Sequence, residues 1–505
     1  MKHHLLRNRA IVFLVVVLCV TLIVYWPSFS HLLRGETYTY FLDTMGDNSI
    51  TSLVSNWYNY EKVRAFDPGD TLLFRPLLFT TLGIEKALFG TNYTYWRIAA
   101  FFMHIVATGS LFRLLWMIRP SVLALLVTLL FSTSIMAVNT VLYEQIAPYM
   151  LFTALVLSGF YYAERGIETR KSTNLIIASA FMLVATFFHE AGVLFTILLI
   201  VYLWLKRRQL GYRWCLTFCS IVLLYLAVYI PEKLISPAPS LSAEFHNIVS
   251  LQSTVVGIGA AITLTASWLL QATLPAIFVL EPITNLRSYS VSIVPALGAV
   301  PIVLNILAIA VVGGGLCYTK GTRRVSGSFL VLLTCSLGIF ILANSFFRAG
   351  SHGVYYLLGH NFNMYIGLAL LVTLAYALVV GLPRFGTKHI TCIALALVVL
   401  IGLNAPKVLM LNYEIRDAEQ PLRSYLSSID NFIELHRDEQ DFSFNAVIED
   451  PAQKDLKFTL YKVKSREPVY CHFTVPQVLY WKYWSEDAPK YTLRYFPESK
   501  ELRNE

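Results

Sequence analysis

The sequence has few charged residues: 14% of its 505 residues are Asp, Glu, Lys or Arg, and 56% are hydrophobic. Soluble domains carry roughly 25% charged residues, so this shortage excludes an ordinary soluble protein. Most of the seven cysteines lie in or beside apolar runs and no CxxC pair occurs, which excludes a disulfide framework and a zinc knuckle. The sequence also lacks an internal repeat and a low-complexity linker. What remains is a membrane protein.

About eleven apolar runs approach the ~20 residues that a helix needs to cross a bilayer. The mean hydropathy of the whole chain, +0.58, is high because of these runs. The predicted spans are 10–28, 94–117, 121–142, 146–163, 174–189, 191–206, 213–230, 290–317, 327–346, 355–382 and 389–411. The first run follows a basic start, as in a signal peptide, but it is long, lacks a small-x-small cleavage site and ends in Tyr25-Trp26-Pro27. We therefore expect it to be retained as a span.

The net charge of +9 follows a topological pattern that does not indicate a nucleic-acid partner. Basic residues cluster after every second span, as the positive-inside rule describes. These clusters are at 7–9, 113–119, 165–171, 206–208, 320–324 and 384–388. The pattern predicts an integral multi-pass protein of a bacterial inner membrane or the endoplasmic reticulum. Its N-terminus is expected in the cytoplasm and its C-terminal domain on the periplasmic or lumenal side.

The expected fold is an all-α polytopic membrane domain, 1–411, followed by a small external α/β or β-rich domain, 412–505. The C-terminal segment is charged and aromatic, with short β-like runs at 444–448, 457–463 and 491–495. Within the membrane domain, 30–92 is a large first external loop. A second external loop, 231–289, contains the apolar run 251–280, whose two ends the charge pattern puts outside. That run is predicted to be an interfacial helix or a re-entrant hairpin.

The first external loop carries two candidate catalytic acids, Asp43 and Asp47. One alternative is that Asp47 caps a following helix. The functional interpretation is that a carboxylate near the membrane surface deprotonates an acceptor that attacks a lipid-phosphate sugar, or holds a divalent metal ion that does so. Asp43 follows two apolar residues and ranks above Asp47 for this role.

Two further candidates follow the acids. Arg75, in Phe74-Arg75-Pro76-Leu77, can grip a phosphate in a bidentate way, although an arginine here can also snorkel to the interface. His104 lies about two turns inside the second span, where an ionisable residue is a functional candidate. A histidine that is hydrogen-bonded between helices is the structural alternative for His104.

Short external turns hold the next candidates. Glu144 lies between the third and fourth spans, and His189-Glu190 lies between the fifth and sixth. Such turns present a side chain from the top of a helix towards whatever the first loop encloses. The pair His189-Glu190 can bind phosphate, bind a metal or form a polar turn. Adjacent side chains point in different directions, which argues against one metal held by both.

A mixture of cationic, imidazole and phenol groups lies at the outer start of the tenth span. This composition suits a phosphate or pyrophosphate head group, and it also occurs in an ordinary aromatic belt. The residues are Arg348, His352, Tyr355, Tyr356 and His360.

Taken together, Phe74-Arg75-Pro76-Leu77, the turn 88–92 and His104 resemble motifs of the GT-C glycosyltransferases that use polyprenyl-phosphate sugars. The closest resemblance is to the transmembrane-and-tetratricopeptide O-mannosyltransferases and their bacterial relatives. Glu144 matches their acid before the fourth span, and His189-Glu190-Ala191-Gly192 is similar to their Lys-Glu-x-Gly turn. Their paired first-loop aspartates are split here, and the tail has no tetratricopeptide repeats.

The resemblance implies an inverting hexosyltransferase with a polyprenyl-phosphate sugar donor and a protein or glycan acceptor. A flippase or transporter of lipid-linked saccharides is the rival hypothesis, for which broken helices near mid-membrane are expected. An inactive scaffold with a GT-C-like fold is a third alternative.

Overall fold

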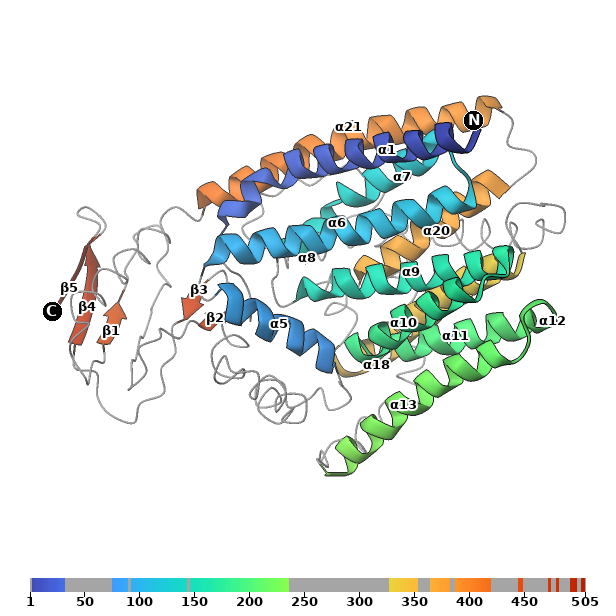
Figure 1. Cartoon of the computed structure of the whole chain (residues 1–505). Helices are drawn as coiled ribbons and strands as arrows, with labels where there is room; N and C mark the ends of the chain where they lie inside the picture. The colour runs from blue at the N-terminus through green and yellow to red at the C-terminus, as the bar shows by residue number, and fades with distance from the viewer. Residues whose placement is uncertain are drawn as a thin grey trace.

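The computed structural model describes residues 2–31, 75–89, 92–142, 146–235, 327–352, 364–381, 387–418 and five short strands between 444 and 504. Its helices form one elongated bundle (Figure 1). In chain order the principal helices are α1 (Lys2–Tyr25), α5 (Pro76–Phe89), α6 (Tyr93–Ile118), α7 (Val122–Ser132), α8 (Ile135–Leu142), α9 (Pro148–Thr169), α10 (Ser172–Phe188), α11 (Ala191–Leu205), α12 (Arg207–Leu210), α13 (Arg213–Ile235), α18 (Gly327–His352), α20 (Met364–Gly381) and α21 (Thr387–Ala418).

Most predicted spans with described residues coincide with apolar helices, and 121–142 is the exception. In the described part of the chain, four helical stretches are long and apolar enough to cross a membrane: Asn8–Ser30, Tyr93–Ile118, Arg213–Pro231 and Lys388–Asp417. Shorter apolar helices pack among them. The predicted span 290–317 and the apolar run 251–280 lie outside the described residues. The architecture is that of a multi-pass membrane protein.

Several turns with basic residues lie at the same end of this bundle (Figure 1). The turns that carry Arg119, Lys171 and Arg207 lie at one end, here called the basic end. Arg119 Nη1 donates to the Val380 carbonyl at 3.2 Å, so the turn after α6 contacts the end of α20. Arg213 Nη2 donates to Ser172 Oγ at 3.0 Å, so the start of α13 contacts the start of α10. The opposite end, where α5 begins, is here called the Arg75 end.

One predicted span proved wrong in detail: 121–142 is two helices, α7 and α8, separated at Thr133-Ser134. The hydroxyl of Thr133 donates to the Leu129 carbonyl at 2.8 Å, and the Ala137 N–H donates to Ser134 Oγ at 3.3 Å. Local bonds of this kind compete with the helical ladder and favour helix termini. Mean apolarity conceals such a break, because Ser and Thr lower it little.

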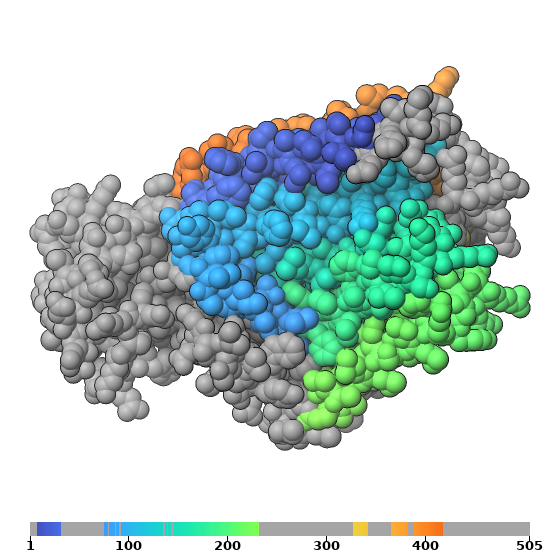
Figure 2. All heavy atoms as spheres, in the orientation of Figure 1, coloured from blue at the N-terminus to red at the C-terminus, as the bar shows by residue number. Residues whose placement is uncertain are grey.

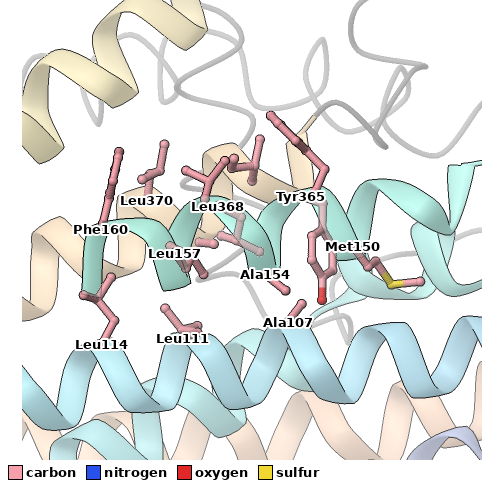
Figure 3. Packing of buried hydrophobic residues seen from close by; sticks show 14 of the residues in the cluster. Ala107, Leu111, Leu114, Met150, Ala154, Leu157, Phe160, Tyr365, Leu368 and Leu370 are labelled. Atoms are coloured by element: carbon pink, nitrogen blue, oxygen red, sulfur yellow. The ribbon is translucent and has the colours of Figure 1, made fainter. Parts of the chain in front are cut away.

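The core lies where α6, α9 and α20 meet. Figure 3 shows their side chains interleaved, with Leu111 of α6, Leu157 of α9 and Leu368 of α20 among the labelled residues. All three are at most 1% exposed. Lipid is as apolar as these side chains, so close van der Waals packing stabilises the helix contacts more than the hydrophobic effect does.

Small residues bring α9 and α10 close together. A methyl group at Gly159 would meet Met182 Sδ at 2.5 Å, and one at Gly166 would meet Leu175 Cγ at 2.6 Å. The two glycines are seven residues apart and therefore share one face of α9. This is the small-residue interface that membrane helices use in place of a hydrophobic driving force.

Two of the three segments predicted to be external, 30–92 and 412–505, contain helical residues that pack in the bundle. The last part of 30–92 is α5, whose Leu78 and Leu82 are each 4% exposed and belong to the core. At the other end of the chain, α21 continues past residue 411 to Ala418. Val408, Leu411 and Ile415 are buried at helical spacing, so the periodic face extends beyond the apolar run.

The C-terminal segment contains short strands: β1 (Phe444–Val447), β2 (Cys471–Phe473), β3 (Val478–Tyr480), β4 (Tyr491–Phe496) and β5 (Glu501–Asn504). The strand order in one sheet is β1-β4-β5, with β1 parallel and β5 antiparallel to β4. Strands β2 and β3 form an antiparallel pair. The predicted runs at 444–448 and 491–495 coincide with β1 and β4, and 457–463 lies outside the described residues.

Candidate functional site

Arg75 stands immediately before α5, at the Arg75 end of the bundle. Pro76 occupies the first helical position, which its fixed φ suits, and the residue before a proline is restricted to extended backbone. Arg75 therefore remains outside the helix, and its side chain is 6% exposed. A charge this well buried requires partners.

Its partners come from two other segments of the chain. Arg75 Nε donates to Glu190 Oε2 at 2.7 Å, and Nη2 donates to Glu190 Oε1 in the same ion pair. Arg75 Nη1 donates to the Tyr149 hydroxyl, and the guanidinium carbon lies 5.5 Å from the Tyr149 ring centroid. The bidentate pair fixes the plane of the guanidinium.

The His189-Glu190 turn is built by close contact between α10 and α11. His189 has extended backbone and Glu190 is helical, so the chain reverses within two residues. A Cβ on Gly192 would lie 2.5 Å from the Ala185 carbonyl oxygen, so this approach requires glycine. The turn holds both side chains at the top of the helix pair.

The pKa of Glu190, the acid of this turn, is lowered. Its side chain is 33% exposed. Burial alone would raise the pKa of the Glu190 carboxyl, but the charge and hydrogen bonds of Arg75 outweigh that effect and lower its pKa to about 2. The carboxylate is therefore charged throughout the physiological range.

The imidazole of His189 is held by its own turn and by two aromatic rings of α9. The Ala191 N–H donates to His189 Nδ1 at 3.0 Å, so Nδ1 is an acceptor and the proton of the neutral ring is on Nε2. The Phe152 ring stacks on the imidazole at 5.0 Å between centroids, and the Tyr149 ring meets it edge-on at 5.1 Å. The turn and the two aromatic rings thereby fix the orientation of the His189 ring.

Arg75, Tyr149, His189 and Glu190 are called the Arg75 cluster below. The predicted candidates Arg75, His189 and Glu190 are thus in one place, although 115 positions separate Arg75 from Glu190. Tyr149 and Phe152 were not among the predicted site residues. In the sequence they are only two aromatic residues, three positions apart, just after Pro148. Aromatic residues are common at such span ends, so this pattern does not indicate a site.

His104 lies elsewhere, in the middle of the bundle. It is 0% exposed, with Nδ1 2.7 Å from the Tyr365 hydroxyl and Nε2 3.1 Å from the Ser132 carbonyl. That carbonyl ends α7, so His104 satisfies a group left by the helix break. The contacts match the structural alternative, a histidine hydrogen-bonded between helices.

A second polar group lies at the Arg75 end, around Arg97 of α6. Arg97 is 1% exposed and its Nη1 donates to the Leu142 carbonyl, the last residue of α8, at 2.5 Å. His31 lies with Nε2 2.7 Å from the Asn412 carbonyl, and Asn412 donates to the Val24 carbonyl at 3.0 Å. These bonds join the ends of α1, α8 and α21 around α6.

The other predicted site residues are placed less fully. The backbone of Arg348 and His352 belongs to the final turns of α18, and their side chains are not among those described. Phe340 of α18 stacks on Phe195 at 6.1 Å, while Phe329 meets Tyr202, so α18 runs antiparallel to α11 and ends towards the Arg75 end. Predicted candidates outside the described residues are Asp43, Asp47, Glu144, Tyr355, Tyr356 and His360.

Metal binding gains no support in the part of the chain that the structure describes. Within those residues, no three His, Cys, Asp or Glu side chains are grouped so that they could hold a metal ion. Glu190 is paired with Arg75, and its Oε2 lies 3.7 Å from Nδ1 of the adjacent His189.

Similarity to known proteins is found at the level of structure. No family model matches the sequence. No curated protein matches it significantly. Among solved structures, the chain is similar to the crystal structure of ArnT from Cupriavidus metallidurans bound to undecaprenyl phosphate, with a TM-score of 0.43 and 11% sequence identity. The similarity covers 88% of this chain and 84% of that chain.

Proposed function

We propose that the protein is a membrane glycosyltransferase that moves a sugar from a polyprenyl-phosphate donor to an acceptor on the non-cytoplasmic side. The observation that carries the proposal is the Arg75 cluster, in which two motifs predicted separately to bind phosphate meet at one end of an apolar bundle. A lipid-linked donor reaches such a site laterally from the bilayer, and its phosphate remains at the level of the helix ends.

The cluster has the groups that a leaving phosphate requires. Developing negative charge is stabilised by donors already in place, and Arg75 and the Nε2–H of His189 are oriented by their neighbours. Glu190 and a donor phosphate would compete for the same N–H groups of Arg75, so donor binding must shift or share that carboxylate. We assign the donor site to Arg75, His189 and Glu190, with Arg348, His352, Tyr355 and Tyr356 completing it.

The base belongs to the first external loop in this proposal. Asp43, with Asp47 as its alternative, takes the proton of the acceptor while the acceptor atom bonds to the anomeric carbon. The bond from that carbon to the phosphate oxygen breaks, and polyprenyl phosphate leaves with inversion of configuration. His31 and Arg75, which flank the segment that bears both acids, lie at the Arg75 end, consistent with this role. Glu144 and His360 remain candidates for acceptor or donor contacts.

Transfer from a panel of polyprenyl-phosphate sugars by the purified protein tests the proposal. Asp43→Asn should abolish transfer with donor binding retained, because the base is lost and the shape is kept. Asp67→Asn is the matched control, an acid of the same loop with no assigned role. Full transfer by Asp43→Asn would move the base to Asp47, and full transfer by the double variant would exclude this loop as the catalytic site.

The donor half of the proposal has its own test. Arg75→Ala should weaken donor binding in a direct binding assay, whereas Arg119→Ala, a cation removed at the basic end, should leave it unchanged. Equal donor affinity in wild type and Arg75→Ala would show that the Arg75 cluster does not bind the donor phosphate.

A transporter of lipid-linked saccharides is the second candidate function. The break between α7 and α8, backed by buried His104, favours it, because transporters place interrupted helices near mid-membrane. Purified protein in liposomes distinguishes the two: movement of a labelled polyprenyl-linked saccharide between leaflets without chemical transfer would support transport and contradict the transferase.

A further inference from the structure

A cationic patch lies at the basic end, on the side formed by the α9–α10 turn and by α12 with the start of α13. It consists of Arg170, Lys171, Arg207, Arg208 and Arg213, called the basic patch below. The hydrogen bond from Arg213 to Ser172 Oγ, at 3.0 Å, brings the two segments together. Cations from separate stretches of sequence therefore form one surface.

Two arginines of the basic patch contact aromatic rings. Arg207 lies 3.9 Å from the Trp204 ring centroid and donates to the Trp204 carbonyl, and Arg213 lies 5.3 Å from the Trp214 ring. The neighbouring acids on α9 are engaged elsewhere: Glu164 accepts from the Tyr202 hydroxyl and Glu168 pairs with Arg165 at 3.4 Å. The positive charge of the patch is consequently not neutralised by those two acids.

An apolar surface adjoins these cations. Below them on α11 and α13, Val201 is 50% exposed, Leu216 68% and Leu223 65%. Trp204 is 48% exposed at the boundary between the two surfaces. Figure 2 shows α12 and α13 in green at the edge of the molecule. A ligand of this surface must therefore carry an anionic group directly next to an apolar part.

We propose that the basic patch binds the head groups of anionic phospholipids whose acyl chains lie along α11 and α13. A phosphodiester head group supplies the negative charge, and the acyl chains supply the apolar contact. Each Lys or Arg near an anionic membrane surface contributes about 1 kcal/mol, so one lost charge weakens binding about fivefold. Polar macromolecules such as nucleic acids match the cations but leave Val201 and Leu216 without a partner.

Native mass spectrometry of the full-length protein tests the proposal, with phosphatidylglycerol and phosphatidylcholine of identical acyl chains as probes. Wild type should retain phosphatidylglycerol preferentially, and the Arg207→Gln/Arg213→Gln variant should lose most of that preference. Lys388→Gln is the matched control: it removes an exposed charge at the same end, but from α21, which Figure 1 places at the opposite edge of the bundle from α13.

Three results would overturn the proposal: equal retention of both lipids by wild type, an equal loss in Lys388→Gln, or displacement of phosphatidylglycerol by millimolar inorganic phosphate. The last would assign the patch to soluble phosphate. Lys171→Gln, an exposed single substitution, repeats the measurement if the double variant does not fold, and it should weaken retention about fivefold.

Discussion

At the scale of single residues, Glu190 has two opposed effects. It compensates the buried charge of Arg75, and it occupies the N–H groups that a phosphate would use. Loss of one partner of a buried charge pair leaves the other uncompensated, which is more costly than the pair itself is worth. The same substitution should therefore weaken the fold and strengthen anion binding.

Glu190→Gln is expected to bind a polyprenyl-phosphate donor more tightly than wild type, since Arg75 no longer faces a competing carboxylate. Its unfolding free energy should fall by about 1–3 kcal/mol, because Arg75 stays buried with a neutral partner. Donor titration and thermal unfolding in detergent measure the two effects. Glu168→Gln, an exposed acid paired with Arg165, should change neither.

The low pKa of Glu190 predicts a pH dependence of stability. Its pKa of about 2 is below the ordinary value of 4.5, so its contribution is full above pH 4.5 and declines as the pH falls towards 2. The difference in melting temperature between wild type and Glu190→Gln should be constant at neutral and mildly acidic pH. It should shrink below pH 4.5. A difference that already disappears near pH 6 would contradict the assignment.

At the scale of helices, contacts at helix ends determine the site. The α10–α11 turn depends on Gly192, where a methyl group would collide with the backbone of Ala185. Gly159 differs, because a methyl group there would first meet the flexible end of the Met182 side chain. The Met182 side chain can change rotamer to avoid an added methyl group, whereas the backbone of Ala185 cannot move without shifting its helix.

Gly192→Ala should therefore lower the unfolding free energy by about 1–3 kcal/mol and disturb donor binding through the adjacent His189-Glu190 turn. Gly159→Ala, at the α9–α10 contact, should cost less than about 1 kcal/mol and leave donor binding intact. Melting temperatures and donor titrations of the two variants provide the comparison. Equal losses would contradict the distinction between a backbone contact at Gly192 and a side-chain contact at Gly159.

The α7–α8 break makes a similar prediction for His104. His104→Leu should lower the unfolding free energy by about 1–3 kcal/mol, since the Ser132 carbonyl and the Tyr365 hydroxyl lose a partner in an apolar core. Thr128→Val on α7 is the control: its hydroxyl donates to the Ala124 carbonyl of its own helix and is also fully buried. Stability equal to wild type in His104→Leu would require another donor at the break.

At the scale of the whole molecule, much of the helical arrangement follows from the sequence. Long apolar runs and alternating basic turns predicted the described spans because length and charge act locally. The sequence also predicted Arg75 and His189-Glu190 as candidates, though not their mutual contact, which depends on how α5, α9 and α10 pack. Tyr149 and Phe152 escaped prediction for the same reason. The break at Thr133 escaped prediction because Ser and Thr interrupt the helix without lowering the mean apolarity of the run.

The proposed orientation of the bundle has a direct test. In a chain with its natural cysteines replaced, Asp417→Cys should react with an impermeant thiol reagent from the non-cytoplasmic side, and Lys171→Cys from the cytoplasm. Both positions are exposed, so access depends on side alone. Labelling of both from one side would contradict the topology and the location proposed for the reaction.

The caps that α6 provides also constrain how the chain enters the membrane. The carbonyls that end α7 and α8 accept bonds from His104 and Arg97, both on α6. An interrupted helix released into lipid with those groups bare would be costly. Because α6 precedes α7 in translation, its polar face is already in the bilayer when the interrupted segment leaves the translocon. Because α6 is synthesised first, its side chains are available to bond the ends of α7 and α8 during insertion. A circular permutation that placed α6 after α8 should therefore insert poorly.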